Sequence, residues 1–502
     1  MRKFFVYTFA LVALTSLQSH RPLLAGTETI TEVRSGVPRF TLNQAILTAL
    51  QRNPDIQRAR QEIERTKGLF LELRAEALPR VDGTSNFAQT DPHLENFTGD
   101  GGSGGGLDSG FVTTIRDYNF RIQATQVIFA GGRVVSQIRS AQFQRDASYF
   151  AFRNTIDLVI ATVRTQFYQV LLNRGLIGVQ EQSVSLLQSQ LQDQQNRFEA
   201  GTVPRFNVLQ AQVALSNQQP DLILARNDYR ISQLQLARTI GLDFDPNRGD
   251  GPPLEAIGEL RYEPRRIPLP MAIAVAKERR PFLKEQKANV LSSGAQVGVA
   301  RSGFFPQINA TGGSDFRSSP ISESLNDVRS GYIFGANGSW AIWDSGQTYG
   351  RLKQAKAVLE QSKITYDDAV RQIELEVQQA YSNLIQSTEL IRSQREAVGQ
   401  AQEALRLARA RLGAGAGTQL EVLNSRVEVT RAESVNLRAL FAYNNAAAEF
   451  DRVTASEITY ANQLDEPRTR DKAKTDAAPT PPPKPTPLPL NRAGIREPVT
   501  GR

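Results

Sequence analysis

Apolar residues recur at every seventh position over two long stretches of the chain. The stretches contain Ile156, Val163, Val170, Ile177, Val184, Leu191 and Phe198, and then Val370, Val377, Leu384, Ile391, Val398, Leu405 and Leu412. An unbroken seven-residue period is typical of a supercoiled helix that packs along its whole length. Many of the companion core positions are small or polar, such as Gln166 and Ser387. We therefore expect long helices packed side by side around water. The first would cover residues 133–199 and span about 100 Å.

Each long helix is followed by a glycine-rich corner and a shorter helix that returns beside it. The corners are Glu199–Pro204 and Gly413–Gly417, and the return helices are expected over residues 205–240 and 419–452. A further helix should begin at Asn53-Pro54, because Asn is a favoured N-cap and Pro is favoured at the first helical position. It should reach about Ala77, because Pro79 cannot continue a helix.

A second period, alternating at every other residue, marks the segments Tyr118–Ile128 and Tyr332–Ile342. Such alternation suits a strand with lipid on one face and water on the other, although a soluble hairpin packed on a core would give the same pattern. Residues 81–89 and 307–316 alternate less clearly and are interpreted as the strands that pair with these. Four strands cannot close a barrel, for which about eight are the practical minimum. Either the strands pair between chains, or the membrane interpretation fails.

The chain contains two copies of one sequence unit in tandem. Residues 45–84 align with residues 272–311, and residues 118–229 align without a gap with residues 332–443. The only change of length falls in the Gly99–Gly110 segment, which we expect to be a loop outside the cell. A tandem repeat of this kind defines the domain organisation. In chain order we expect a signal peptide (1–25), an N-terminal segment (26–39), a first repeat (40–240), a linker (241–268), a second repeat (269–455) and a Pro-rich flexible tail (456–502).

The N-terminus predicts export from the cytoplasm. Arg2 and Lys3 precede an apolar run over residues 4–17, which fits a secretory signal peptide cleaved after Ala25. The run is too short for a membrane-spanning helix, which needs about 20 residues. A buried N-terminal helix is the alternative interpretation. If the exported chain crosses a membrane, it must do so with strands.

Composition removes most kinds of active site. The 502 residues include no cysteine and only two histidines, so cysteine nucleophiles, disulfides, zinc fingers, iron–sulfur sites and three-histidine metal sites are excluded. The formal charge of +8 is spread along the chain and indicates solubility rather than nucleic-acid binding. We expect no catalytic, cofactor or metal site, and therefore no enzyme.

Several motifs together resemble the TolC-like outer-membrane efflux family over about residues 40–455. They are Thr41–Ala45 through Asn53-Pro54, Ala77–Pro79, Val127–Gly132, Arg197–Gly201 with Val208-Leu209, and Arg411–Gly415 with Glu421–Leu423. Each motif alone is weak, but their order, duplication and spacing are specific. The resemblance implies an α + β membrane protein. Long helices of the tandem repeats would form a coiled-coil barrel, and each chain would add four strands to a trimeric twelve-stranded transmembrane β-barrel.

The resemblance also implies a function and partners. The homotrimer would be a passive exit duct of a tripartite efflux pump or type I secretion system, set in outer-membrane lipid with its helices in the periplasm. Its partners would be a periplasmic adaptor and an inner-membrane pump or ABC transporter, with no nucleic acid. The alternative is a coiled-coil envelope or surface structural protein without a channel, which would have no use for the alternating segments. Neither the residues nor the resemblance indicates which substrate such a duct would carry.

Two sets of residues follow from the family. A ring of acidic residues commonly closes the tip in this family; here Glu421 takes the first position, while Asn424 stands where a second carboxylate is often found. Asn207 is grouped with them as a gate residue. A solvated acid favoured by the helix dipole is the alternative for Glu421. Adaptor docking is expected at the two corners, at Gly201, Thr202, Val203, Gly415, Ala416 and Gly417.

Overall fold

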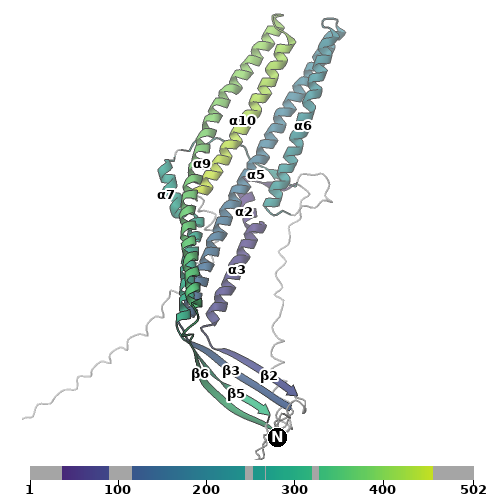
Figure 1. Cartoon of the computed structure of the whole chain (residues 1–502). Helices are drawn as coiled ribbons and strands as arrows, with labels where there is room; N and C mark the ends of the chain where they lie inside the picture. The colour runs from purple at the N-terminus through teal and green to yellow at the C-terminus, as the bar shows by residue number, and fades with distance from the viewer. Residues whose placement is uncertain (1–36, 90–115, 243–252, 266, 319–326, 456–502) are drawn as a thin grey trace, which may run out of the picture.

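Long helical hairpins form one end of the molecule and a single sheet forms the other (Figure 1). The computed structural model describes residues 37–89, 116–242, 253–265, 267–318 and 327–455. The helices are α2 (Leu42–Arg52), α3 (Pro54–Ala75), α5 (Arg133–Glu199), α6 (Arg205–Thr239), α7 (Leu269–Arg279), α8 (Pro281–Arg301), α9 (Gln347–Gly413) and α10 (Gln419–Val453). The strands are β1 (Arg39–Phe40), β2 (Arg80–Gln89), β3 (Arg116–Ala130), β4 (Glu255–Ala256), β5 (Gln307–Ser318) and β6 (Val328–Ser339), and a 3-10 turn, η2 (Ser302–Phe304), precedes β5.

Some expectations cannot be compared with this structure. The signal peptide (1–25), most of the N-terminal segment, the Gly99–Gly110 loop and the Pro-rich tail (456–502) lie outside the described residues. Within the described ranges, no helix combines the length and the apolar character that a membrane-spanning helix requires.

Local signals account for where the helices begin and end. The Thr41 hydroxyl accepts a hydrogen bond from the Gln44 backbone, and the Gln44 side chain accepts one from the Thr41 backbone, so a capping box opens α2. The Asn53 side chain accepts from the backbone of Asp55 at 2.8 Å, immediately before Pro54 opens α3. The predicted bounds of α5 are confirmed, and those of α6 and α10 agree within one residue. Helix α3 ends two residues before its predicted end.

Each repeat has its own hydrophobic core, and helices of the second repeat also pack against the first. In the first repeat, α2, α3 and α6 pack on α5, while α7, α8 and α10 pack with α9 in the second. Helices α8 and α10 also contact α5, so the repeats lie side by side along much of their length.

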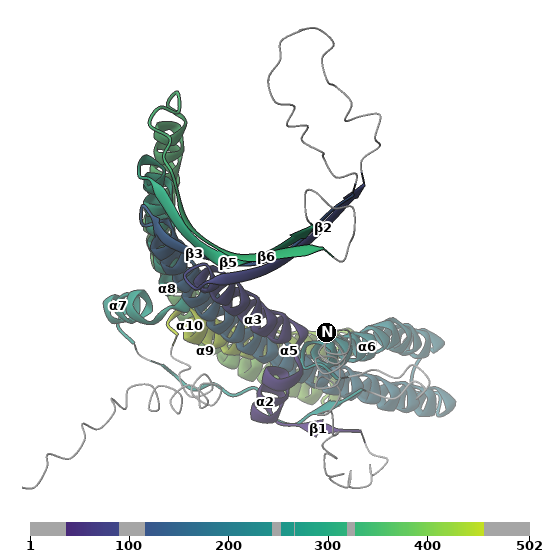
Figure 2. The ribbon, with the colours of Figure 1, turned by 90° about the horizontal axis from the view of Figure 1, so that it is seen from below.

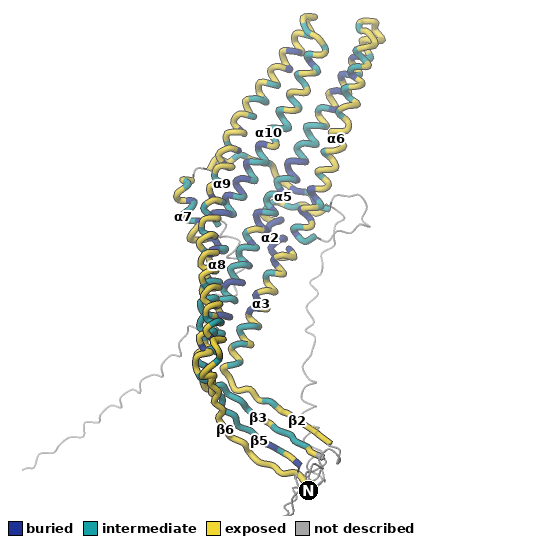
Figure 3. Tube along the Cα trace, viewed as in Figure 1, coloured by how far each residue is buried: buried dark blue, intermediate teal, exposed yellow. Residues whose placement is uncertain are grey.

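The first seven-residue line is buried in the middle of the molecule and becomes exposed at its corner (Figure 3). Val163 and Val170 are fully buried, whereas Phe198 at the end of this line is 44% exposed. The second line stays packed toward its corner, where Leu405 is buried and Leu412 packs against the same cluster. The prediction of packing along the whole length is therefore wrong only at the end of the first line in a single chain. Fewer helices of the same chain surround α5 there, because α3 and α8 pack on it only toward the sheet.

The four-stranded sheet is antiparallel throughout and has the order β2-β3-β5-β6 (Figure 1). Its central pair, β3 and β5, joins the two repeats, with Arg121 opposite Asp315 and Thr125 opposite Thr311. The strand predicted over Tyr118–Ile128 is confirmed and is longer than expected, and the two weakly alternating segments are also strands. Seen from below, the strands bend along their length (Figure 2).

The second alternating segment ends earlier than predicted. Strand β6 ends at Ser339, so Trp340 and Ile342 do not belong to it. The Asp344 carboxylate accepts hydrogen bonds from the backbone of Gly346 at 3.0 Å and Thr348 at 2.7 Å, which builds the turn into α9. The chain must leave the sheet before that turn, and this ends the strand.

The connection between the repeats contains a packed segment that composition did not reveal. Strand β4 pairs in parallel with β1, and Leu254 and Ala256 are fully buried. The Arg174 guanidinium of α5 donates to the Ala256 carbonyl at 2.8 Å, and the Gln233 side chain of α6 donates to the Leu254 carbonyl at 2.7 Å. This part of the predicted linker therefore packs against both helices of the first hairpin.

Candidate functional site

Both corners are built by the same hydrogen-bond pattern. At the first, the Gly201 N–H donates to the Phe198 carbonyl and the Thr202 N–H donates to the Arg197 carbonyl, both at 2.9 Å. At the second, Gly415 and Ala416 donate to the equivalent carbonyls of α9. This is the Schellman arrangement, which requires a left-handed residue. Gly201 and Gly415 supply it, with φ of 70° and 74°.

The two corners then open their return helices differently. Pro204 is the N-cap of α6 and makes no side-chain cap bond, whereas the Thr418 hydroxyl accepts from the Glu421 backbone at 3.2 Å and caps α10. A Cβ at Gly417 would lie 3.0 Å from the Leu412 nitrogen, so this position favours glycine for space alone. The small residues at the corners are thus explained by turn chemistry, and their part in adaptor docking remains a prediction.

The three predicted gate residues lie beside the corners, and in the described part of the chain no hydrogen bond or ion pair joins them to one another. The Glu421 carboxylate is partly exposed and lies 3.7 Å from the Arg411 Nη1 atom. Asn424 is exposed one turn further along α10, and Asn207 is half-buried, with its N–H donating to the Pro204 carbonyl at 3.0 Å. The pairing of Glu421 with Arg411 is not predicted by any local sequence pattern.

A second polar contact near the corners was also missed. The Arg426 Nη1 atom of α10 donates to the Leu186 carbonyl at 3.0 Å and to the Gln190 side chain at 2.7 Å, both on α5. Burial lowers the pKa of the Arg426 guanidinium, and the positive charge of Arg409 adds to the effect. Arg426 lines a groove of about 390 Å³ between the hairpins. It therefore ties the second hairpin to the first.

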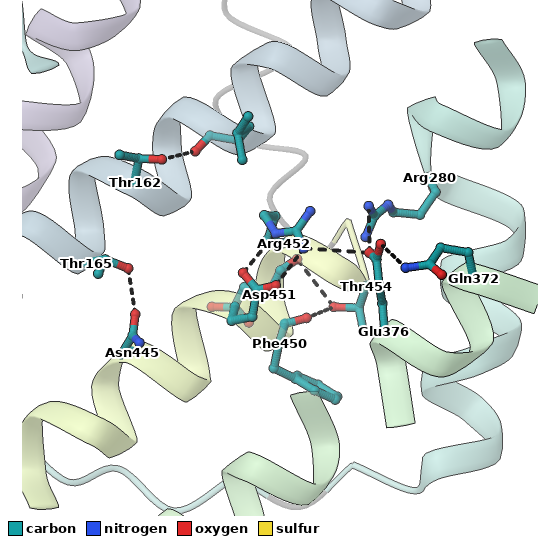
Figure 4. Close-up of polar contacts among 12 residues, drawn as sticks. Thr162, Thr165, Arg280, Gln372, Glu376, Asn445, Phe450, Asp451, Arg452 and Thr454 are labelled. Carbon is teal, nitrogen blue, oxygen red and sulfur yellow. Dashed lines mark hydrogen bonds and ion pairs between the residues drawn. The ribbon is translucent and has the colours of Figure 1, made fainter. Parts of the chain in front are cut away.

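An ion-pair cluster joins the two repeats closer to the sheet (Figure 4). Asp451 of α10 accepts from Arg164 of α5 at 3.1 Å and from Arg265 of the connection, and Thr165 donates to the Asn445 side chain at 2.6 Å. These contacts bind the end of the second repeat to the long helix of the first.

The same cluster contains a deeply buried arginine. The Arg280 side chain, at the start of α8, is 5% exposed and lies 3.1 Å from the Glu376 carboxylate of α9. Arg452 lies 3.6 Å from the same carboxylate. Burial lowers the pKa of Arg280, and the charge of Glu376 opposes that shift. Residues more than 70 positions apart thus meet in one network, which no local pattern could reveal.

The described ranges also bear on chemical centres of other kinds. No group of three or more His, Cys, Asp or Glu side chains there is placed to hold a metal ion. The features that remain are the two corners, the contacts between hairpins, and the sheet at the opposite end.

The chain contains two copies of one unit, each with a strand pair and a helical hairpin. The hairpins lie at one end and the shared sheet lies at the other, which defines an α + β tandem-repeat protein. The chain belongs to the outer membrane efflux protein family, whose model matches residues 45–242 and 272–456. The match covers both repeats and leaves out the connection between them.

Relatives and solved structures agree with this assignment. The solvent efflux pump outer membrane protein SrpC of Pseudomonas putida is 23% identical over 386 residues, covering 76% of this chain and 78% of that protein. The cation efflux system protein CusC of Escherichia coli is 21% identical and covers 84% of this chain and 83% of its own length. The Campylobacter jejuni CmeC outer membrane channel has the same fold, with a TM-score of 0.74, 16% identity, and coverage of 85% and 89%.

Proposed function

We propose that three copies of this chain form a passive exit duct across the outer membrane and periplasm. The observation that carries the proposal is the sheet: among the described strands, β2 and β6 each have one edge without a partner. Backbone groups at such edges cannot stay unpaired in lipid. Pairing β2 of one copy with β6 of the next, three times over, would close a barrel of twelve strands.

The side chains of the sheet support the same arrangement. Cross-strand partners share a face, so Phe120, Phe316, Tyr332 and Phe334 lie on one face and Arg121 and Asp315 lie on the other. Tyr332 is 80% exposed and Phe334 is 78% exposed, which is costly in water and favourable in lipid. The charged face would then line the water-filled interior.

The helices would extend into the periplasm as two repeats, residues 40–240 and 269–455, joined by the connection 241–268. Near the corners, apolar side chains such as Phe206, Leu209 and Leu420 are exposed in the single chain. We expect neighbouring copies and a periplasmic adaptor to cover them. An inner-membrane pump or ABC transporter would supply the energy, since the duct performs no chemistry. A structural envelope protein without a channel is the second candidate, but it would have no use for the sheet.

The cargo class is only partly constrained. Relatives are named for the efflux of solvents, cations and antibiotics. This chain contains no cysteine, two methionines and two histidines, which mildly disfavours a soft-metal path because such ions prefer sulfur and imidazole ligands.

Replacing Glu421 with Gln should weaken the block of single-channel current by divalent cations. If three Glu421 carboxylates converge on the axis, they concentrate cations at the mouth, and their loss should raise the blocking concentration roughly threefold. Asn424→Asp should strengthen the block by adding a second carboxylate. Arg411→Gln should also strengthen it, because Arg411 lies 3.7 Å from the Glu421 carboxylate and offsets its charge.

Planar-bilayer recording with added divalent cations measures all four proteins under the same conditions. Thermal unfolding should be nearly unchanged, because these side chains are exposed or partly exposed. Equal cation sensitivity in wild type and all three variants would make Glu421 a solvated helix-start acid. A purified chain that forms no conducting pore at all would overturn the proposed function itself.

A further inference from the structure

Exposed aromatic side chains lie where the sheet meets the helices. Trp340 and Trp343 are 57% and 86% exposed, and Tyr349, in the first turn of α9, is 66% exposed. Trp340 directly follows the last residue of β6. Its indole N–H donates to the Phe304 carbonyl at 3.2 Å, which fixes the ring at the junction. Aromatic side chains with one polar end favour the boundary between lipid tails and water.

The first turns of α9 carry basic residues and no acids. Arg351, Lys353 and Lys356 are exposed, and the first acidic residue of the helix is Glu360. In the described part of the chain none of the three has a hydrogen bond or an ion pair. Their own chain therefore leaves this charge uncompensated.

The matching helix of the first repeat is different. Arg133 at the start of α5 lies 3.1 Å from Glu76, and Arg145 pairs with Asp146. Arg139 of α5, which aligns with Lys353, is exposed and has no ion pair in the described part of the chain. The start of α5 thus leaves one basic residue unpaired, and the start of α9 leaves three.

We propose that Trp340, Trp343, Tyr349, Arg351, Lys353 and Lys356 form a collar that binds anionic phospholipids at the periplasmic face of the outer membrane. The inference rests on the proposed function, because it needs the sheet in the membrane and the helices in the periplasm. Along α9, Lys356 lies about 10 Å beyond Tyr349, which matches the depth of a headgroup layer. The aromatic rings would sit at the acyl boundary, and the basic side chains would reach the phosphates.

The two tryptophans are the only ones in the chain, so their fluorescence reports on the lipid beside the collar. The full chain is reconstituted in phosphatidylcholine containing a small equal fraction of either brominated phosphatidylglycerol or brominated phosphatidylcholine. The brominated anionic lipid should quench at least about twofold more strongly, because each basic side chain near the surface attracts anionic lipid. Higher salt should reduce this preference.

Two triple variants separate the collar from general charge. Arg351→Gln, Lys353→Gln and Lys356→Gln together should make the two brominated lipids quench equally. The control removes three exposed charges from the same helix farther from the sheet, as Arg371→Gln, Arg392→Gln and Arg409→Gln, and should keep the preference.

Each outcome tests either the anionic-lipid preference of the collar or the position of the tryptophans in lipid. Equal quenching by both lipids in wild type would overturn the anionic-lipid collar, and no quenching by either would show that the tryptophans do not face lipid. Conductance of the same reconstituted protein is measured alongside. If the protein conducts ions but shows equal quenching or no quenching, only the lipid-binding collar is contradicted. If the protein conducts no ions, the proposed duct is contradicted.

Discussion

Replacing Val170 with Asp should abolish the folded protein. Val170 is fully buried in the core of the first repeat, on the seven-residue line of α5. A carboxylate there has no partner and costs several kcal/mol at each site, a large part of the stability of an ordinary domain. We expect little folded oligomer in detergent extracts, measured by size-exclusion chromatography and thermal unfolding. Leu384→Asp, at 6% exposure in the second repeat, should act similarly.

The matched control lies on the same line. Phe198 is also part of the seven-residue series of α5, but it is 44% exposed near the corner. Phe198→Asp should therefore lower the unfolding midpoint far less than Val170→Asp does. Full thermal stability of Val170→Asp would mean that this position faces water, and the packing of the long helices would have to be rebuilt.

Replacing Glu376 with Gln should cost about 3 kcal/mol of unfolding free energy. The change leaves Arg280, whose side chain is 5% exposed, without its carboxylate, and a buried charge that loses its partner is strongly destabilising. Because Glu376 is itself partly exposed, we expect a loss at the lower end of the roughly 3–5 kcal/mol that breaking a buried ion pair costs. The midpoint of thermal or denaturant unfolding of the detergent-solubilised protein measures the effect.

Two further variants test the cause. Replacing both partners, as Arg280→Met with Glu376→Leu, should recover more than half of the loss. The buried charge of Arg280 is then gone, and Arg452 keeps its ion pair with Glu449. Glu374, two residues earlier on α9, pairs with Lys277 at the surface, so Glu374→Gln should cost less than about 1 kcal/mol. If Glu374→Gln and Glu376→Gln lower the unfolding free energy by similar amounts, the burial of Arg280 does not make its ion pair more important than a surface pair.

Periodic features of the sequence predicted the helices and strands well. The seven-residue lines and the Gly-rich corners fixed α5, α6 and α10 to within a residue, because period and turn chemistry are local properties. The end of β6 was misjudged because alternation continues through Trp340 and Ile342, while the turn built by Asp344 removes them from the sheet. Side-chain capping decided that boundary, and alternation alone does not report it.

Contacts between distant segments could not be predicted. Arg164 and Asp451 are 287 positions apart, and Arg426 reaches the Leu186 carbonyl across 240 positions. Nothing in either neighbourhood marks these arginines as different from exposed ones. The gate residues were placed by family resemblance, and among the described residues the Glu421 carboxylate forms an ion pair with Arg411 alone. Whether three copies bring the carboxylates together depends on assembly, which the seven-residue period does not encode.

The orientation of the duct can be measured directly with two single-cysteine variants, because the chain has no cysteine of its own. Asp327 is exposed beside the end of β6 farthest from the helices, and Thr202 is exposed at the first corner. A membrane-impermeant maleimide should label Asp327→Cys on intact cells and should label Thr202→Cys only after the outer membrane is permeabilised. Labelling of Thr202→Cys on intact cells, or of Asp327→Cys only after permeabilisation, would contradict an outer-membrane duct with periplasmic helices.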